Sequence, residues 1–237
     1  MHKFIITFLI VFFVLFLIKD QSVKNCDLFM EKHERNNIIS QLGDYILESD
    51  FSSLPINESK LFMAIKYRYG IGVDRNLTES KKILFSMEDK GNEKIQAAKN
   101  YMLGTQMYSC ENGSGIGFLA LANEYGDLKS TFILPYIRFY DSNFDMDISD
   151  YVEEIRKSMF LGNDFSVFEY IYLQEKYNEK DKINQWVSVF NKSPLLNDCE
   201  FYEFIKNGQG LGGLSVDWAV KKDILNRYWK GYINKCE

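Results

Sequence analysis

The sequence predicts an all-α protein, an α/α superhelical solenoid of antiparallel helix hairpins. Two observations predict it. Gly91, Gly126 and Gly162 each close a helical stretch and precede Asn or Asp, and they are 35 and 36 residues apart. Periods of this length are typical of helical repeats that bury their apolar faces by stacking on one another. The stretch "YRYGIGVDRN" also places a Gly-x-Gly turn between two helical segments, as an αα-hairpin requires.

Residues 1–22 indicate a signal peptide or an N-terminal anchor. Lys3 precedes an unbroken apolar run from Phe4 to Ile18, whereas a helix that spans a bilayer needs about 20 apolar residues. The run is therefore typical of a secretory leader. No small-x-small cleavage pattern follows it, so an uncleaved membrane anchor stays open as the alternative. We expect an exported protein of the bacterial periplasm, either soluble or anchored by this segment.

Residues 23–58 are expected to form N-terminal capping helices, and residues 59–237 the degenerate repeats with a C-terminal capping helix. Of the 237 residues, 46% are hydrophobic and 16% aromatic, which is ample for a packed core. The formal net charge is -5, and no basic run follows the leader. Because nucleic acids attract clustered lysine and arginine, we expect no nucleic-acid partner.

The first repeat shows the pattern most clearly. Its first helix, "KLFMAIKYRY", has apolar residues near helical periodicity, and the turn glycines Gly70 and Gly72 can adopt positive φ. Thr78 is the expected N-cap of the second helix, "ESKKILFSMEDK", and Gly91 is its expected left-handed C-terminal cap. Hairpin turns are predicted near residues 70–77, 104–116, 140–148, 177–181 and 208–214.

This unit resembles that of the Sel1-like repeat family, whose members are relatives of the tetratricopeptide solenoids. The family's unit runs from a helix ending near a tyrosine, through a Gly-x-Gly-Val turn, to a second helix closed by a small residue, two others and Gly-Asn or Gly-Asp. The residues that match it in register are Tyr67, Gly70, Gly72, Val73, Gly91 and Asn92. Later turns, such as "YSCENGSGIG" and "YDSNFDMDIS", are degenerate. The resemblance covers residues 59–231 and implies an α/α solenoid.

Four cysteines, Cys26, Cys110, Cys199 and Cys236, make an even count in a chain expected to be exported. Two disulfides are therefore predicted, with three connectivities open and buried free thiols as the alternative. We favour Cys199 with Cys236, because a helix hairpin closed by "NGQGLGG" folds its outer ends towards one another, which leaves Cys26 with Cys110. No C-x-x-C pair is present, so zinc and thioredoxin-type sites lack their spacing.

The sequence offers little for catalysis, cofactors or metals. His2 lies in the leader and His33 in a charged helical stretch, "EKHERNN", so a Ser-His-Asp or Cys-His arrangement lacks a suitable base. The glycines of "NGQGLGGLS" lack the Lys-Ser or Lys-Thr of a nucleotide-binding loop. Asp145, Asp147 and Asp150 lack the spacing of a calcium loop and are interpreted as an acidic helix N-terminus. We assign no catalytic, cofactor or metal residue, and we do not expect an enzyme.

What remains is an unusual number of aromatic residues, as in "VFEYIYLQEKY", which beyond the core suit the binding of another protein. The sequence thus favours a non-catalytic protein-binding solenoid. Exported proteins built of Sel1-like repeats are known as antidotes to phospholipase effectors of the type VI secretion system, and the resemblance implies such an immunity role, by occlusion of the toxin's active site. The partner contacts that we predict are Lys66, Tyr69, Arg138 and Tyr140. The alternatives are a cell-envelope scaffold that binds constitutive partners and a cysteine-rich solenoid hydrolase.

Overall fold

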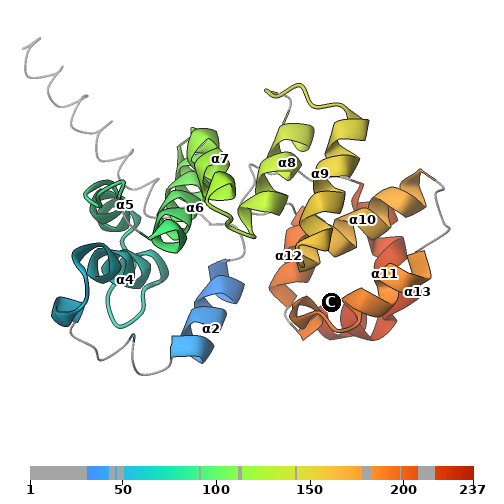
Figure 1. Ribbon diagram of the computed structural model, residues 1–237. Helices are drawn as coiled ribbons and strands as arrows, with labels where there is room; N and C mark the ends of the chain where they lie inside the picture. The colour runs from blue at the N-terminus through green and yellow to red at the C-terminus, as the bar shows by residue number, and fades with distance from the viewer. Residues whose placement is uncertain are drawn as a thin grey trace, which may run out of the picture.

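The computed structural model describes residues 31–42, 46, 51–90, 92–111, 114–141, 143–177, 183–197, 199–207 and 217–237, which form helices and turns with no β-strand among them (Figure 1). The predicted all-α architecture is confirmed. Helix α2 (Glu31–Leu42) comes first, and the helices that follow form hairpins. The hairpins are α4 (Ile56–Tyr69) with α5 (Leu77–Phe85), α6 (Glu93–Cys110) with α7 (Ile116–Glu124), α8 (Ser130–Tyr140) with α9 (Ile148–Phe160), α10 (Asp164–Lys176) with α11 (Ile183–Phe190), and α12 (Cys199–Asn207) with α13 (Trp218–Cys236).

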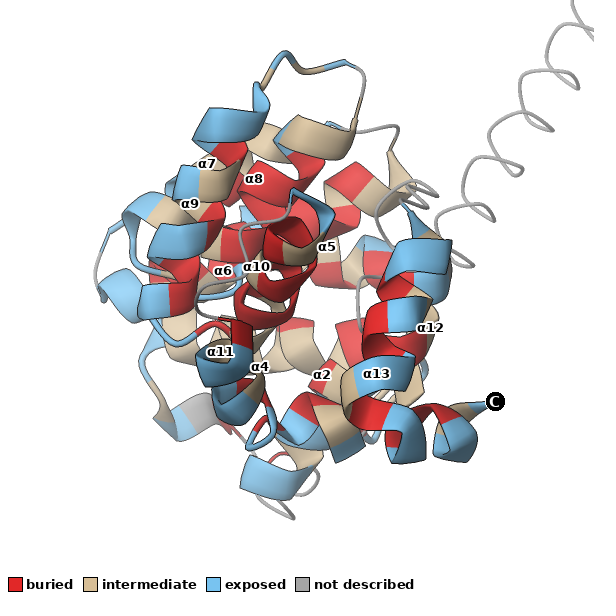
Figure 2. Cartoon of the chain, turned by 90° about the vertical axis from the view of Figure 1, so that its right-hand side faces the viewer, coloured by how far each residue is buried: buried red, intermediate tan, exposed pale blue. Residues whose placement is uncertain are grey.

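The hairpins stack in chain order around a continuous core. From α4 to α11 each helix packs against the next, α12 pairs with α13, and α10 also contacts α13. Buried residues lie on the sides of the helices that face one another (Figure 2). The main cluster of buried residues reaches from Ala64 to Ile233. Since each hairpin buries its apolar side only against its neighbours, the core runs along the stack.

The repeated glycines end the second helices of two hairpins. Gly126 and Gly162 follow α7 and α9 and have φ values of 80° and 91°. In each case the amide of the next residue donates back to a carbonyl five positions earlier, as in a Schellman motif. These bonds join Asp127 to Ala122 at 2.9 Å and Asn163 to Ser158 at 3.2 Å. The acceptors Ala122 and Ser158 are small and buried, so the helix ends pack closely.

The residue after each repeated glycine also accepts a hydrogen bond from an amide in the first turn of the following helix, as the N-cap in Asn92 and Asn163 and from two residues before the N-cap in Asp127. Side-chain oxygens of Asn92, Asp127 and Asn163 accept amide hydrogen bonds from Lys94 at 2.9 Å, Ser130 at 2.7 Å and Ser166 at 3.2 Å. A Gly-Asn or Gly-Asp pair therefore ends one helix and begins the next, which explains why the two residues recur together. Gly91 lies outside the described residues.

The first hairpin turn lies where the sequence predicts it. Gly70 and Gly72 have φ values of 62° and 69°, a region that costs glycine little because it has no Cβ. The prediction of Thr78 as the N-cap is wrong. Asn76 caps α5 instead, because its extended backbone lets its side chain accept an amide hydrogen bond at 3.0 Å. The helix ends earlier than predicted, at Phe85.

The second predicted turn is wrong at its start, because Gly104 lies inside α6 and the helix continues to Cys110. Gly104 is a close-packing position. A Cβ there would lie 2.7 Å from Cγ of Leu119, and a Cβ on Gly115 would lie 1.9 Å from the carbonyl oxygen of Gly104. Neither distance is compatible with a side chain, so these two glycines permit the close approach of α6 and α7.

The later turns agree with the prediction as far as the described residues reach. Helix α8 ends at Tyr140 and α9 begins at Ile148, which matches the turn predicted at 140–148. Helices α10 and α12 end at Lys176 and Asn207, at the start of the turns predicted at 177–181 and 208–214. Most of those two turns lies outside the described residues.

A disulfide closes the last hairpin. Cys199, at the start of α12, is bonded to Cys236, at the end of α13, with a Cα–Cα distance of 5.3 Å, which confirms the favoured pairing. Cys110 is disulfide-bonded as well. Its predicted partner, Cys26, lies outside the described residues, as does the whole segment 1–22 that is predicted to be a leader or anchor. Among the helices that are described, none is long and apolar enough to cross a membrane.

Candidate functional site

Helix α2 lies against both ends of the stack. In Figure 1 it is placed between the first two hairpins and α12. Its polar contacts include those with Tyr69 at the end of α4, Tyr101 in α6, Lys129 just before α8, and Glu200 in α12. We call the surface formed by these four residues the inner face. A helix of 12 residues is about 18 Å long, so the stack curves enough to bring its first and last hairpins within reach of one short helix.

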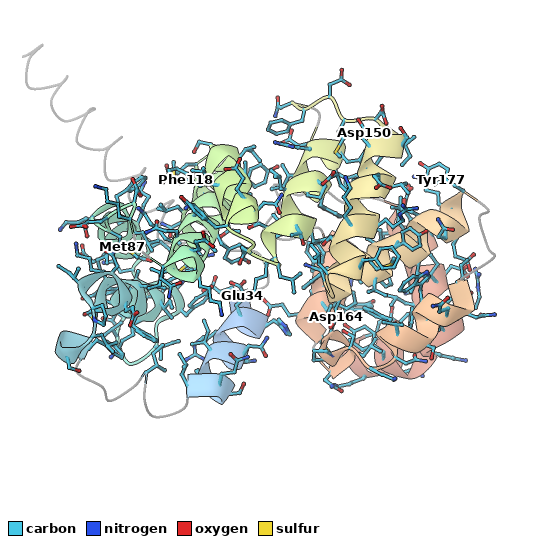
Figure 3. The ribbon with its side chains drawn as sticks, viewed as in Figure 1. Glu34, Met87, Phe118, Asp150, Asp164 and Tyr177 are labelled. Atoms are coloured by element: carbon cyan, nitrogen blue, oxygen red, sulfur yellow. A yellow bond between two sulfur atoms is a disulfide. The ribbon has the colours of Figure 1, made fainter. Side chains whose placement is uncertain are left out.

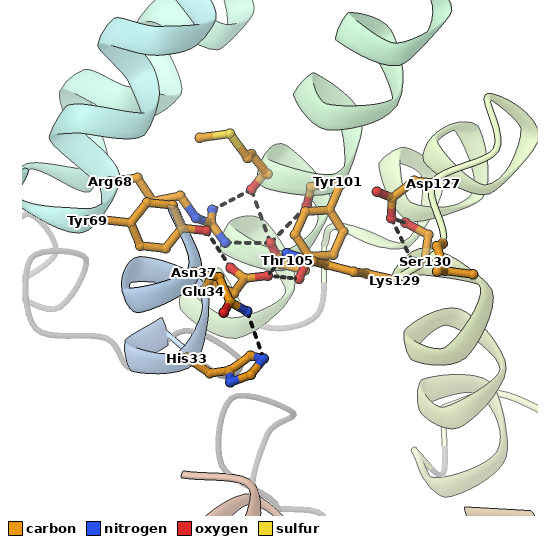
Figure 4. Close-up of polar contacts among 12 residues, drawn as sticks. His33, Glu34, Asn37, Arg68, Tyr69, Tyr101, Thr105, Asp127, Lys129 and Ser130 are labelled. Carbon is orange, nitrogen blue, oxygen red and sulfur yellow. Dashed lines mark hydrogen bonds and ion pairs between the residues drawn. The ribbon is translucent and has the colours of Figure 1, made fainter. Parts of the chain in front are cut away.

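Glu34 of α2 is the centre of these contacts, and its side chain is only 3% exposed (Figure 3). The hydroxyl of Tyr101 donates to its Oε1 at 2.5 Å, and the ammonium group of Lys129 donates to the same oxygen at 2.7 Å. The hydroxyl of Tyr69 donates to Oε2. Figure 4 shows these donors converging on one carboxylate. Three parts of the stack that are far apart in sequence thus bind the same side chain.

The charges around Glu34 keep it ionised. Burial alone would raise the pKa of the Glu34 carboxyl, but the positive charges of Lys129 and Arg68 outweigh burial and hold that pKa below its usual range. Burial raises the pKa of Tyr69 and Tyr101 well above the ordinary tyrosine value, and the Glu34 carboxylate adds to the effect. Both tyrosines therefore remain hydrogen-bond donors across the physiological pH range.

Arg68 is fully buried beneath this cluster. Its two terminal nitrogens donate to the carbonyl of Met102 at 2.8 Å and to Oγ1 of Thr105 at 2.7 Å. Its Nε has no hydrogen-bond partner among the described residues. Burial alone would lower the pKa of the Arg68 guanidinium, but Tyr69 and the nearby Glu34 carboxylate together raise it above its usual value.

The N-terminus of α2 contacts the other end of the stack. The Glu200 carboxylate accepts hydrogen bonds from the backbone amides of Lys32, at 2.8 Å, and His33. A carboxylate at this position satisfies free amides and complements the helix dipole. Glu31 of α2 also pairs with Arg75, in the turn after α4, at 2.8 Å. Both ends of the stack therefore contribute to the position of α2.

A second buried carboxylate repeats the arrangement near the C-terminus. Glu169 of α10 accepts hydrogen bonds from the hydroxyls of Tyr140 at 2.7 Å and Tyr151 at 3.0 Å, and it forms an ion pair with Lys221 of α13 at 2.8 Å. The ammonium group of Lys221 lies 4.5 Å from the ring centre of Tyr172, a favourable cation–π distance. This cluster attaches α13 to the stack.

The four predicted partner contacts lie at different places. Tyr69 is buried and Tyr140 is half-buried, and their hydroxyls bind Glu34 and Glu169. Neither hydroxyl is presented to a partner in this conformation. Lys66 is half-buried, with its ammonium group 5.7 Å from the ring centre of Phe51, and Arg138 is exposed. The structure does not bring the four residues together in one surface.

Glu34 and Glu200 were missed by sequence reasoning. The stretch "EKHERNN" around Glu34 contains only charged and polar residues, so it resembles the start of a solvated helix. His33, predicted to be a surface residue, is half-buried and hydrogen-bonds Asn37 at 2.9 Å. The acidic residues before α9 form a helix cap as predicted, since Asp147 accepts a hydrogen bond from the amide of Asp150 at 2.9 Å. Among the residues that the structure describes, no group of histidine, cysteine or acidic side chains is arranged to hold a metal ion.

Comparison with known proteins identifies the fold. No family model matches the chain, and no curated protein sequence matches it. Among solved structures, a Sel1 repeat protein from Oxalobacter formigenes matches with a TM-score of 0.50 and 13% identity, over 76% of this chain and 73% of that one. A protective antigen of uropathogenic Escherichia coli strains, described as displaying an SLR fold, matches with a TM-score of 0.48 and 15% identity, over 70% of this chain and 37% of that one. The chain therefore has the helical-repeat fold of the Sel1 repeat protein.

Proposed function

We propose that this chain is a non-catalytic protein-binding member of the Sel1-like repeat proteins, and that its partner is a toxic effector enzyme that it neutralises. The observation that carries the binding role is a row of large apolar side chains at the ends of two neighbouring second helices. We call this row the exposed edge. It consists of Leu121, Tyr125, Leu128, Phe160 and Leu161.

The exposed edge combines residues of two neighbouring hairpins. The side-chain amide of Asn163 donates to the carbonyl of Leu128 at 2.8 Å, which ties the segment after α9 to the segment after α7. Phe160 and Leu161 are 69% and 64% exposed. Large exposed apolar side chains that gather in one region are typical of a site where another protein binds. Rigid aromatic and aliphatic side chains at its centre would bury well against a partner.

The buried carboxylates support a structural rather than a catalytic role. Both oxygens of Glu34 and both oxygens of Glu169 already accept hydrogen bonds from tyrosine or lysine. The pKa of Glu34 lies below its usual range, which makes it a poor proton donor or acceptor at neutral pH. Binding alone would be the activity. An interface of about 800 Å² on each partner is enough to cover the active site of a small enzyme.

The resemblance to exported Sel1-like antidotes is the support for a toxin partner, and it suggests a phospholipase delivered by a type VI secretion system into the periplasm. The test first looks for a lipase reading frame directly upstream of that of this chain and then purifies its product. We expect the purified full chain to abolish its lipase activity at a one-to-one ratio. Replacing Phe160 and Leu161 by serine should weaken inhibition at least tenfold, whereas Glu124→Gln, at an exposed position of α7, should not.

Two results would overturn parts of this proposal. Full lipase activity with excess chain, and no complex in size-exclusion chromatography, would refute the antidote role. A stable complex with a resident envelope protein, disrupted by the same serine substitutions, would instead support the alternative of a cell-envelope scaffold.

A further inference from the structure

We propose that α2 occupies the binding site of a partner helix, and that the inner face accepts a helical segment with a glutamate in its first turn after displacing α2. This inference rests on the proposed protein-binding function and names the chemistry of a segment that the chain recognises. The inner face differs from the exposed edge in its location, and it binds through polar rather than apolar contacts.

The first argument is that α2 is held mainly by polar contacts. Glu34 is the only residue of α2 that is buried. Three apolar residues, Ile38, Ile39 and Leu42, are partly buried against a small separate cluster that includes Phe51 and Ile71. Helices α6 and α10, in contrast, bury most of one side in the stack. A helix attached through a few directional contacts can leave without opening the main core, because it contributes little apolar area to that core.

The second argument is that the stack itself assembles the site. The donors Tyr69, Tyr101 and Lys129 lie in α4, in α6 and just before α8, so the backbone that carries them belongs to the packed stack and not to α2. Glu200 on α12 lies where it meets the first amides of the bound helix. Together these groups recognise two features of a bound helix. One is a carboxylate in its first turn, and the other is the backbone N–H groups at its N-terminus.

The third argument is that the site demands an anion. The hydroxyls of Tyr69 and Tyr101 and the ammonium group of Lys129 all donate to the Glu34 carboxylate, and Tyr69 and Tyr101 are buried. If α2 left an empty site, these donors would lose the anion that they share, which is unfavourable for a buried donor. Release of α2 is therefore coupled to the arrival of another carboxylate. The inner face is in this way selective for an acidic helical segment over a neutral or basic one.

Displacement would also expose the one predicted partner contact that belongs to this site. Tyr69 is buried under α2 in the present conformation and donates its hydroxyl to Glu34. With α2 replaced by a partner helix, the same hydroxyl would bind the partner's carboxylate. Since α2 is covalently tethered to its site, its high effective concentration makes it a strong competitor of any segment added in solution.

The experiment uses the full chain and a labelled synthetic peptide with the sequence of residues 31–42. We expect the Glu34→Gln chain to bind this peptide at least tenfold more tightly than the wild-type chain, in which α2 competes. The Glu31→Gln chain loses the ion pair of α2 with Arg75 but keeps the inner face intact, so it is a second variant, should Glu34→Gln fold poorly. A peptide carrying Gln in place of Glu34 should bind the Glu34→Gln chain at least tenfold more weakly than the natural peptide. The chain with Glu124→Gln should behave as wild type.

Hydrogen exchange supplies the second measurement. In the Glu34→Gln chain the amides of α2 should exchange at least tenfold faster, while those of α6 and α8 stay as slow as in the wild type. Unchanged exchange in α2, faster exchange in all three helices, or no peptide binding by either variant would overturn the inference and make α2 a fixed part of the fold. None of these results would affect inhibition through the exposed edge, so the failure of this inference is distinguishable from failure of the proposed function.

Discussion

Glu169 of α10 and Lys221 of α13 form an ion pair at 2.8 Å in which each side chain is only 3% exposed. Glu34 and Lys129 form the corresponding pair at the other end of the stack at 2.7 Å, with Lys129 53% exposed. Each carboxylate also accepts two tyrosine hydroxyls. The difference in exposure separates the two clusters, because the C-terminal pair is sealed, whereas the pair that holds α2 is open to solvent on its lysine side.

The sealed pair leads to a stability prediction. Lys221→Met leaves the Glu169 carboxylate buried without its counter-ion, which costs about 3–5 kcal/mol in free energy of unfolding. Lys222→Met is the matched control, since Lys222 pairs with Glu237 at the surface and an exposed pair contributes less than about 1 kcal/mol. Chemical denaturation of both variants measures the difference. Equal losses would show that burial does not determine the strength of the Glu169 pair.

The repeat architecture could be predicted from the sequence because its signals are local. A Gly-Asn or Gly-Asp pair specifies a left-handed cap and an acceptor for an amide at the start of the next helix through residues that are adjacent in sequence, and Gly126 and Gly162 both begin such a pair. Gly104 was misinterpreted as part of a turn, because a glycine that ends a helix and one that permits close packing look alike without knowledge of the neighbouring helix.

The inner face could not be predicted, because none of its signals is local. Glu34 lies 67 residues before Tyr101 and 95 before Lys129 in the sequence. Its burial follows from the curvature of the whole stack. A charged residue within a charged helix is exposed in most proteins, so only the assembled hairpins distinguish Glu34 from its neighbours.

The two glycines at the α6–α7 contact allow a second stability prediction. Gly104→Ala places a Cβ 2.7 Å from Cγ of Leu119 and 2.9 Å from its backbone nitrogen, so the helices must move apart at a cost of about 1–3 kcal/mol. Gly117→Ala is the control, because a Cβ there meets nothing within 4 Å. Within α7, alanine should be neutral or stabilise by up to about 1 kcal/mol. Thermal unfolding that ranks the two variants the other way would contradict the packing argument.

The disulfide of the last hairpin is expected to stabilise α12 and α13. It joins Cys199 and Cys236, which are separated by 37 positions in the sequence. A crosslink over a segment of this length restricts the unfolded chain, and its loss costs about 2–4 kcal/mol. Replacing both cysteines by serine should lower the denaturation midpoint accordingly. A variant as stable as the wild type would indicate that the packing of α13 alone holds the hairpin closed.

The ion pair of Glu34 with Lys129, which is open to solvent on its lysine side, predicts how stability depends on pH. The charges of Lys129 and Arg68 hold the pKa of Glu34 below its usual range, although burial opposes them. A carboxyl whose pKa is lower in the folded than in the unfolded state stabilises the fold fully when the pH is above its unfolded pKa, about 4.3. This contribution disappears as the pH falls through the pKa of the folded state. We therefore expect the free energy of unfolding to decrease from about pH 5 downwards.

In Glu34→Gln the decrease should be shallower, because glutamine does not titrate, and Glu124→Gln should retain the wild-type slope. Unfolding by urea between pH 3 and pH 6 measures all three chains. Parallel curves for wild type and Glu34→Gln would mean that Glu34 has the same pKa in both states, and that the inner face does not favour its ionised form.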